Sequence, residues 1–117
     1  MQSKRSNRVA ELLKREISKI LVEDIKDPDI SIVTITYVKI SDDLKFAKIY
    51  FTVLGDKTLR QKTQQGLNRA TAFIRSEIGR RVNLKYNPEL KFYYDTVTDY
   101  VENLENLFLK IKEGNSN

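Results

Sequence analysis

Two β-patterned segments joined by a four-residue turn are the feature that most constrains the fold of this chain. The first, IVTITYVKI (32–40), is dense in β-branched and aromatic residues, and the second, KFAKIYFTV (45–53), alternates strictly. One face of the second segment carries Ala47, Ile49, Phe51 and Val53. The connection SDDL predicts an antiparallel hairpin. Its apolar face needs a second layer of structure to cover it.

Helical patterns surround this hairpin and could supply that layer. Apolar residues recur at three- and four-residue steps over 6–22, and 57–82 is helical in character. Residues 89–95 (ELKFYYD) alternate as a third strand, and a last amphipathic helix is marked by Tyr100, Val101, Leu104, Leu107, Phe108 and Ile111. The order α-β-β-α-(α)-β-α predicts an α+β fold with one antiparallel three-stranded sheet and its helices on one face. Residues 1–97 would form the domain, and 98–117 a C-terminal helix with a frayed tail.

Composition limits the function. The 117 residues suffice for one domain, and the net charge of +5 with a pI of about 9.4 favours a polyanionic partner. The chain has no cysteine and no histidine, which excludes thiolate chemistry and the commonest general base. No apolar run approaches the ~20 residues of a membrane span, and the basic amino terminus lacks the pattern of a signal peptide. We therefore expect a cytoplasmic protein with no membrane partner.

The helical region 57–82 carries four arginines around three small central residues. On a straight helix, Leu59, Gly66 and Leu67 face one direction, whereas Ile74 and Ile78 face another, rotated by roughly 80°. A kink at Ala70, Thr71 and Ala72 would remove this conflict and present the amino end of a second helix to an anion. Alternatively, the apolar stripe simply drifts and the small residues are packing. The candidate RNA-binding arginines at the kink are Arg69, Arg75, Arg80 and Arg81.

Other basic residues form two further candidate surfaces. The first helix places four cations within about 60° of one another, opposite its apolar stripe; these are Lys4, Arg8, Arg15 and Lys19. This ridge could bind phosphates, or it could be a solvated face on which Glu11 pairs with Arg15. Lys45 and Lys48 lie in the second strand. Lys48 shares a face with Phe46 and Tyr50, and Lys91 shares one with Tyr93; such a sheet face could stack bases unless the last helix covers it.

The acidic clusters do not indicate a catalytic or metal site. Asp24, Asp27 and Asp29 surround a proline, and Asp42 and Asp43 occupy the hairpin turn, where such residues are ordinary turn formers. The four glycines show no phosphate-loop spacing. We therefore expect no cofactor, no metal, no small-molecule substrate and no enzymatic activity.

Three stretches carry a resemblance to a known family. They are Asp27-Pro28, SDDLKFAKIYFTV (41–53) and ATAFIRSEIGRRVNLKYNPELKFYYD (70–95), and they resemble ribosome-binding factor A, a type II KH-like domain. The resemblance spans roughly residues 4–111. It implies the order α-β-β-α-kink-α-β, with Ala70-Thr71-Ala72 in place of the family's Ala-x-Gly kink.

The resemblance also implies a function. A member of this family would bind the small (30S) ribosomal subunit and its 16S ribosomal RNA, and would aid late rRNA processing and cold adaptation; we expect it to act as a monomer. The alternative is a KH-like protein–protein interaction module without direct RNA binding. DNA binding is a further alternative, although no helix-turn-helix spacing is evident.

Overall fold

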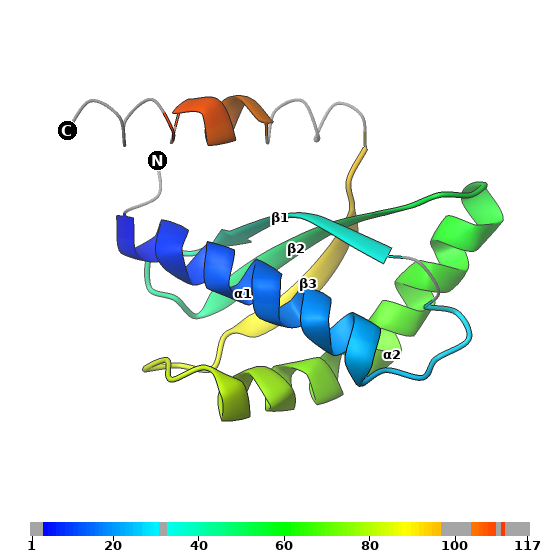
Figure 1. Ribbon diagram of the computed structural model, residues 1–117, viewed down its shortest axis with the longest axis horizontal. Coiled ribbons are helices and arrows are strands. Elements are labelled where there is room, and N and C mark those ends of the chain that lie inside the picture. The colour runs from blue at the N-terminus through cyan, green and yellow to red at the C-terminus, as the bar shows by residue number, and fades with distance from the viewer. Residues whose placement is uncertain (1–3, 31–32, 97–103, 110, 112–117) are drawn as a thin grey trace.

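The protein has an α+β fold, as the sequence pattern predicts. The computed structural model describes residues 4–30, 33–96, 104–109 and 111. In chain order its elements are α1 (Lys4–Glu23), β1 (Val33–Ile40), β2 (Phe46–Val53), α2 (Lys57–Arg81) and β3 (Glu89–Tyr94) (Figure 1). Residues 104–109 are helical, in agreement with the expected last helix, whereas Tyr100, Val101 and the expected tail lie outside the described residues.

The three strands form one mixed sheet in the order β1-β2-β3. β1 and β2 are antiparallel, but β2 and β3 are parallel, with Ala47 opposite Leu90 and Phe51 opposite Tyr94. The expectation of a wholly antiparallel sheet is therefore wrong. The physical reason is that α2 forms a long crossover between β2 and β3 and returns the chain to the end of the sheet at which β2 began.

Both long helices pack on the same face of the sheet, and the core lies between these two layers (Figure 1). α1 contributes an apolar stripe that includes Leu13, Ile17 and Ile20, each fully buried. The register slips near Thr36, which shifts the buried positions of β1 from Ile35 to Val38 and Ile40. Within the described ranges, no helix is both long and apolar enough to cross a bilayer.

Residues 41–44 (SDDL) form the hairpin turn, and their polar side chains stabilise it with hydrogen bonds. The Asp43 carboxylate accepts hydrogen bonds from the Ser41 hydroxyl at 2.6 Å and from the Lys45 backbone N–H at 3.0 Å. These two bonds, of which the one from Ser41 has the larger effect, lower the pKa of Asp43. Leu44 adopts a left-handed φ of 63°, which costs energy for a branched residue, but its side chain is buried in the core. Asp43 therefore serves the turn, as the sequence predicts.

α2 is one continuous helix through Ala70–Ala72, so the change of direction expected from a kink occurs as a bend that does not interrupt the helix (Figure 1). Its buried stripe (Thr63, Leu67, Ile74 and Ile78) runs down a single side, while the ribbon changes direction part-way along (Figure 1). The Thr71 hydroxyl donates to the Leu67 carbonyl at 2.8 Å, a bond that tends to bend helices. Since the helical hydrogen bonds continue through this region, the expected second amino end, with its free N–H groups for an anion, is not formed.

A position in α2 that has no room for a larger residue is Gly66, one turn before Ala70. A Cβ atom there would lie 2.8 Å from Ile30 Cγ1 and 3.3 Å from Asp29 Cβ. Gly66 therefore allows the connection between α1 and β1 to pack directly against α2. This connection carries the acidic residues that lie opposite the α2 arginines.

Candidate nucleic-acid interface

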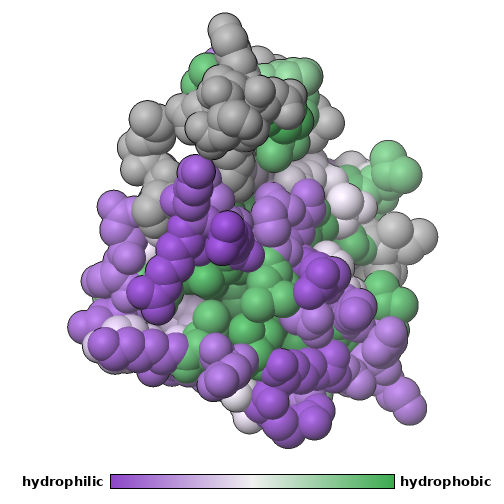
Figure 2. Space-filling model, turned by 60° about the vertical axis from the view of Figure 1, so that its left-hand side comes forward, coloured by the Kyte–Doolittle hydropathy of each residue, from purple (hydrophilic) through white to green (hydrophobic). Residues whose placement is uncertain are grey.

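The cations predicted on the first helix form an exposed ridge on the side of α1 that faces away from the sheet. Lys4, Arg8, Arg15 and Lys19 are all exposed, and the helical period places them on one face. Their ion pairs are weak: Glu16 lies 3.7 Å from Arg15 and 3.9 Å from Lys19. Figure 2 shows the side of the molecule with the start of α1 and the β1–β2 turn, where hydrophilic residues surround a smaller hydrophobic area.

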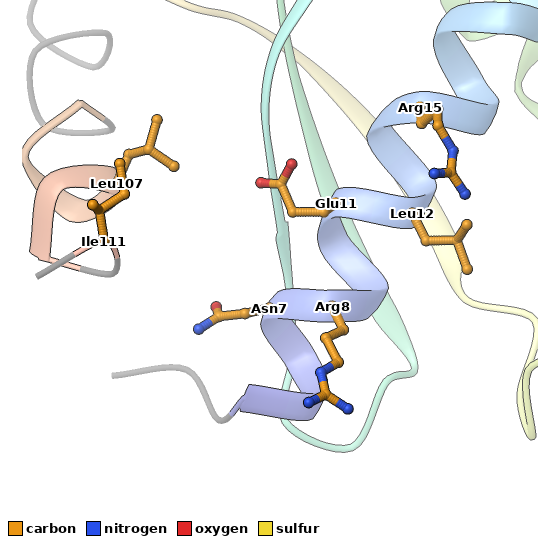
Figure 3. Close-up of a pocket in the computed structure, with 7 residues that line it drawn as sticks. All are labelled: Asn7, Arg8, Glu11, Leu12, Arg15, Leu107 and Ile111. Atoms are coloured by element: carbon orange, nitrogen blue, oxygen red, sulfur yellow. The ribbon is translucent and has the colours of Figure 1, made fainter. Parts of the chain in front are cut away.

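A pocket of about 650 Å³ adjoins this ridge, between α1 and the C-terminal helical residues. Asn7 and Glu11 project from α1 toward Leu107 and Ile111, whereas Arg8 and Arg15 project from the neighbouring side of the helix (Figure 3). The described C-terminal residues therefore lie beside α1. The alternative that the last helix covers the outer face of the sheet is therefore not supported by the described C-terminal residues (Figure 3).

Arg69 is held by two carboxylates of the α1–β1 connection. Its Nη2 donates to Asp29 Oδ2 at 2.7 Å and to both oxygens of Asp27 at 3.1 Å. The backbone N–H of Asp29 and then the Arg69 guanidinium lower the pKa of Asp27. These two aspartates, in turn, raise the pKa of Arg69. The guanidinium is thus already paired before any RNA arrives.

The last two arginines of α2 are paired in a similar way. Glu77 accepts from Arg80 at 2.6 Å and from Arg81 at 3.0 Å, and these bonds lower the pKa of Glu77. Arg81 also donates to Asp24, at the end of α1. The charge of Glu77 is therefore compensated by two cations on its own helix.

Arg75 points to a different part of the molecule. It donates from Nε to the Pro88 carbonyl at 3.1 Å and from Nη2 to the Asn87 carbonyl at 2.9 Å. The Asn87 side chain returns a hydrogen bond to the Arg75 carbonyl at 3.0 Å. The structure therefore joins Arg69 and Arg81 to the connection that follows α1 and Arg75 to the loop before β3, and pairs Arg80 within α2. It does not gather the four arginines around Ala70–Ala72. Their contact with RNA remains a prediction.

The outer face of the sheet carries a row of three cations, of which one was not predicted from the sequence. Lys39 lies opposite Lys48, and Lys48 lies opposite Lys91, so three exposed lysines form one row across the strands. Lys48 was predicted as an RNA-binding residue and Lys91 as part of a candidate stacking face, whereas Lys39 was not predicted. Alternation alone places Lys39 and Lys91 on outward positions, but the row depends on the register and on the parallel pairing of β3.

A row of three tyrosines lies next to the lysine row. Tyr50 stacks on Tyr93 with ring centroids 5.7 Å apart, and Tyr37 lies tilted against Tyr50 at 6.2 Å. Burial and then the Glu11 carboxylate raise the pKa of Tyr37, so its hydroxyl remains protonated as a hydrogen-bond donor. The face thus combines hydroxyl and ammonium donors.

Lys45, the other predicted lysine of this hairpin, lies beside a pocket at the edge of the sheet. Its ammonium is 5.1 Å from the centre of the Tyr86 ring. The pocket has a volume of about 350 Å³ and is lined by Lys45, Phe46, Arg75, Tyr86, Asn87 and Glu89. Phe46 belongs to the stacking face expected from the sequence, whereas Tyr86 was not predicted as a site residue; their exposed aromatic rings distinguish this pocket from the rest of the face.

Comparison with known proteins now assigns the chain to a family. The family model of ribosome-binding factor A matches residues 5–108. This chain belongs to the ribosome-binding factor A family. Ribosome-binding factor A from Desulfitobacterium hafniense (strain DSM 10664 / DCB-2) is 45% identical over 113 residues, which cover 97% of this chain and 90% of that protein.

Solved structures of the family share the fold. Ribosome-binding factor A from Thermus thermophilus, in its crystal structure, matches with a TM-score of 0.68 at 21% identity, covering 76% of this chain and 93% of that chain. A Thermus thermophilus ribosome-binding factor A homology model, fitted into a cryo-EM map of a 30S complex, matches with a TM-score of 0.61 at 23% identity. That match covers 72% of this chain and 88% of the other. The resemblance stated from the sequence is therefore confirmed.

Proposed function

We propose that this protein is a non-catalytic assembly factor that binds the small (30S) ribosomal subunit through its 16S ribosomal RNA and aids late rRNA processing and cold adaptation. It would act as a cytoplasmic monomer. The Thermus thermophilus relative fitted into a 30S complex supports the subunit as partner. The observation that carries the proposal for this chain is the α1 ridge of Lys4, Arg8, Arg15 and Lys19, whose side chains are exposed and only weakly paired.

The chemistry of the ridge suits a phosphate backbone. Arginine presents a planar fork to phosphate oxygens, and lysine adds a mobile point charge. Each phosphate neutralised releases counterions, so binding weakens steeply as salt rises. Such contacts position a protein on folded RNA without reading its sequence.

Co-sedimentation with purified 30S subunits across a salt series tests the proposal. We expect the Arg8→Gln/Arg15→Gln variant to require lower salt for binding and to show a shallower salt dependence. Lys57→Gln/Lys62→Gln removes the same charge from exposed positions of α2 and is the matched control. Equal behaviour of the two variants would contradict the assignment of the ridge, and no binding by the parental protein would contradict the proposed function.

A protein–protein module is the second candidate, because apolar side chains near the α1 pocket are exposed. Phe108 is 69% exposed and Leu109 59%, beside the pocket that Leu107 and Ile111 line. Co-sedimentation that is insensitive to salt but lost in Phe108→Ser would favour this candidate. Retained binding in Phe108→Ser would count against it.

A further inference from the structure

The lysine row on the outer face of the sheet lacks ion-pair partners within the described part of the chain. Lys39, Lys48 and Lys91 take part in none of the ion pairs that the structure shows there. Like charges directly opposite one another on neighbouring strands repel, since the strands are only about 4.8 Å apart. This repulsion destabilises the protein when no ligand is bound. A ligand with several negative charges in a line would relieve it.

The tyrosine row specifies which part of such a ligand this face contacts. Tyr50 and Tyr93 stack on each other, and the ammoniums of Lys91 and Lys48 lie 5.7 Å and 6.0 Å from the centre of the Tyr93 ring. Tyr50 and Tyr93 cover one face of each other and are only partly exposed, so they offer a base less open ring surface than the exposed Phe46 and Tyr86. The lysine ammoniums remain as donors, and the matching acceptors are phosphate oxygens.

The pocket at the edge of the sheet offers this more open aromatic surface. Phe46 is 56% exposed and Tyr86 42%, and both line the same pocket of about 350 Å³. Phe46 precedes Lys48 by two residues on the same side of β2, so the pocket lies roughly 7 Å from the lysine row. Glu89 also lines the pocket and could accept a hydrogen bond from an exocyclic amino group.

We propose that this surface binds a single-stranded RNA segment. Its phosphates lie along Lys39, Lys48 and Lys91, and one unpaired base stacks between Phe46 and Tyr86. A base-paired strand has no free base to insert, so the surface selects against duplex RNA. The inference rests on the proposed function for the kind of polymer, but it uses the face of the sheet opposite to α1 and makes a second, separate contact.

Fluorescence anisotropy with a fluorescein-labelled single-stranded RNA decamer of mixed sequence tests this site. We expect Lys48→Gln/Lys91→Gln to bind about tenfold more weakly and to lower the slope of log K against log salt by about 1.4, or ~0.7 per phosphate lost. Phe46→Leu/Tyr86→Leu should also bind about tenfold more weakly, with the salt slope unchanged, because it removes stacking only. The decamer in duplex form should bind more weakly than the single strand.

Controls separate this site from general charge and from the proposed function. The exposed pair Lys57→Gln/Lys62→Gln has the same charge change, and we expect it to bind the decamer within about twofold of the parental protein. A loss as large as that of Lys48→Gln/Lys91→Gln, or parental affinity in both sheet variants, would overturn the inference. Parental protein that binds the decamer through the sheet but fails to co-sediment with 30S subunits would overturn the proposed function alone.

Crosslinking provides a measurement that does not depend on the folding of any variant. The parental protein is irradiated with a single-stranded decamer that contains 5-bromouridine, and the attached peptides are identified by mass spectrometry. We expect crosslinks in the peptides that contain Phe46 or Tyr86. Crosslinks confined to α1 would overturn the inference.

Discussion

The arginines of α2 and the lysines of the sheet differ in what surrounds their charges. Arg69, Arg75 and Arg81 each donate to oxygens of a neighbouring loop. Lys48 and the two lysines opposite it face solvent and one another, without an acidic partner among the described residues. The comparison teaches that the density of positive charge along a sequence does not locate a binding surface. What matters is whether the fold has already satisfied those charges.

Side-chain chemistry explains this division. A guanidinium presents several donors in a fixed plane and can bridge two oxygens, which suits it to fastening a loop to a helix. Arg69 bridges Asp27 and Asp29, and Arg75 bridges the carbonyls of Asn87 and Pro88. An ammonium on a flexible stem is strongly hydrated and suits a mobile contact with phosphate.

The largest expected effect is the loss of stability on removing Arg75. Arg75→Met deletes two hydrogen bonds to the Asn87 and Pro88 carbonyls, and we expect the free energy of unfolding to fall by about 2 kcal/mol. Urea denaturation followed by circular dichroism measures this change. Because Arg75 also fastens the loop that carries Tyr86 to the edge pocket, decamer affinity of the folded variant should fall as well.

Arg80→Met is the control for this prediction. Arg80 is exposed and pairs only with Glu77 on its own helix in the described structure, so its loss should change stability far less than the loss of Arg75. Equal destabilisation by the two substitutions would show that the contacts to Asn87 and Pro88 have no special role.

The close packing at Gly66 gives the next largest effect. In Gly66→Ala, the new methyl group would lie 2.8 Å from Ile30 Cγ1 and push the α1–β1 connection away from α2. Overpacking costs about 1–3 kcal/mol, and alanine returns ~1 kcal/mol of helix propensity, so we expect a net loss of about 1 kcal/mol in thermal denaturation. The loss of stability caused by Gly66→Ala should be smaller in an Ile30→Ala background than in the parental protein, because the shorter side chain leaves room for the new methyl group. A gain in stability for Gly66→Ala would mean that the Ile30 side chain moves away from the new methyl group at little cost.

Acid should weaken the contacts of the α2 arginines. The pKa values of Asp27 and Glu77 are lowered in the folded protein, so the unfolded chain binds more protons below their ordinary values near 3.8 and 4.5. Stability from these groups is complete above that range and is lost as pH falls through the lowered folded-state values. Thermal melts from neutral to strongly acidic pH should show a smaller acid-induced loss for Arg69→Met than for the parental protein. An identical loss would contradict the pairing of Arg69 with Asp27.

The smallest expected effect has the opposite sign. Lys48→Gln removes the central charge of the lysine row and relieves repulsion with Lys39 and Lys91, so we expect the free energy of unfolding to rise by a few tenths of a kcal/mol. Thermal denaturation at low salt detects this gain, which should shrink at high salt as screening increases. A clear loss of stability would mean that Lys48 has a structural role.

The elements could be predicted well from the sequence because their patterns are local. The strict alternation of β2 and the apolar stripe of α1 each report a buried face directly, and the hairpin turn follows from Ser41 and Asp43. The direction of β3 was not predictable in this way. A strand of alternating residues such as Leu90 and Phe92 reads the same whether its neighbour is parallel or antiparallel.

The candidate site was predicted only in part, because its charges depend on contacts distant in sequence. Arg69 and Asp27 are separated by 42 residues, so nothing near Arg69 shows that its charge is paired. Likewise, Lys39 and Lys91 join Lys48 only through the sheet register. The drift of apolar positions along α2 predicts a kink at Ala70–Ala72, and the structure accommodates the drift with a continuous, bent helix (Figure 1).

Decamer affinity and melting temperature, measured side by side for two variants, test the division of the cations most directly. The variants are Lys39→Gln/Lys48→Gln/Lys91→Gln and Arg69→Met. We predict that the lysine variant melts at or above the parental temperature and loses most of its affinity, whereas Arg69→Met melts lower and keeps parental affinity. A lysine variant that binds RNA normally, together with an Arg69→Met protein that melts normally but fails to bind, would contradict this account.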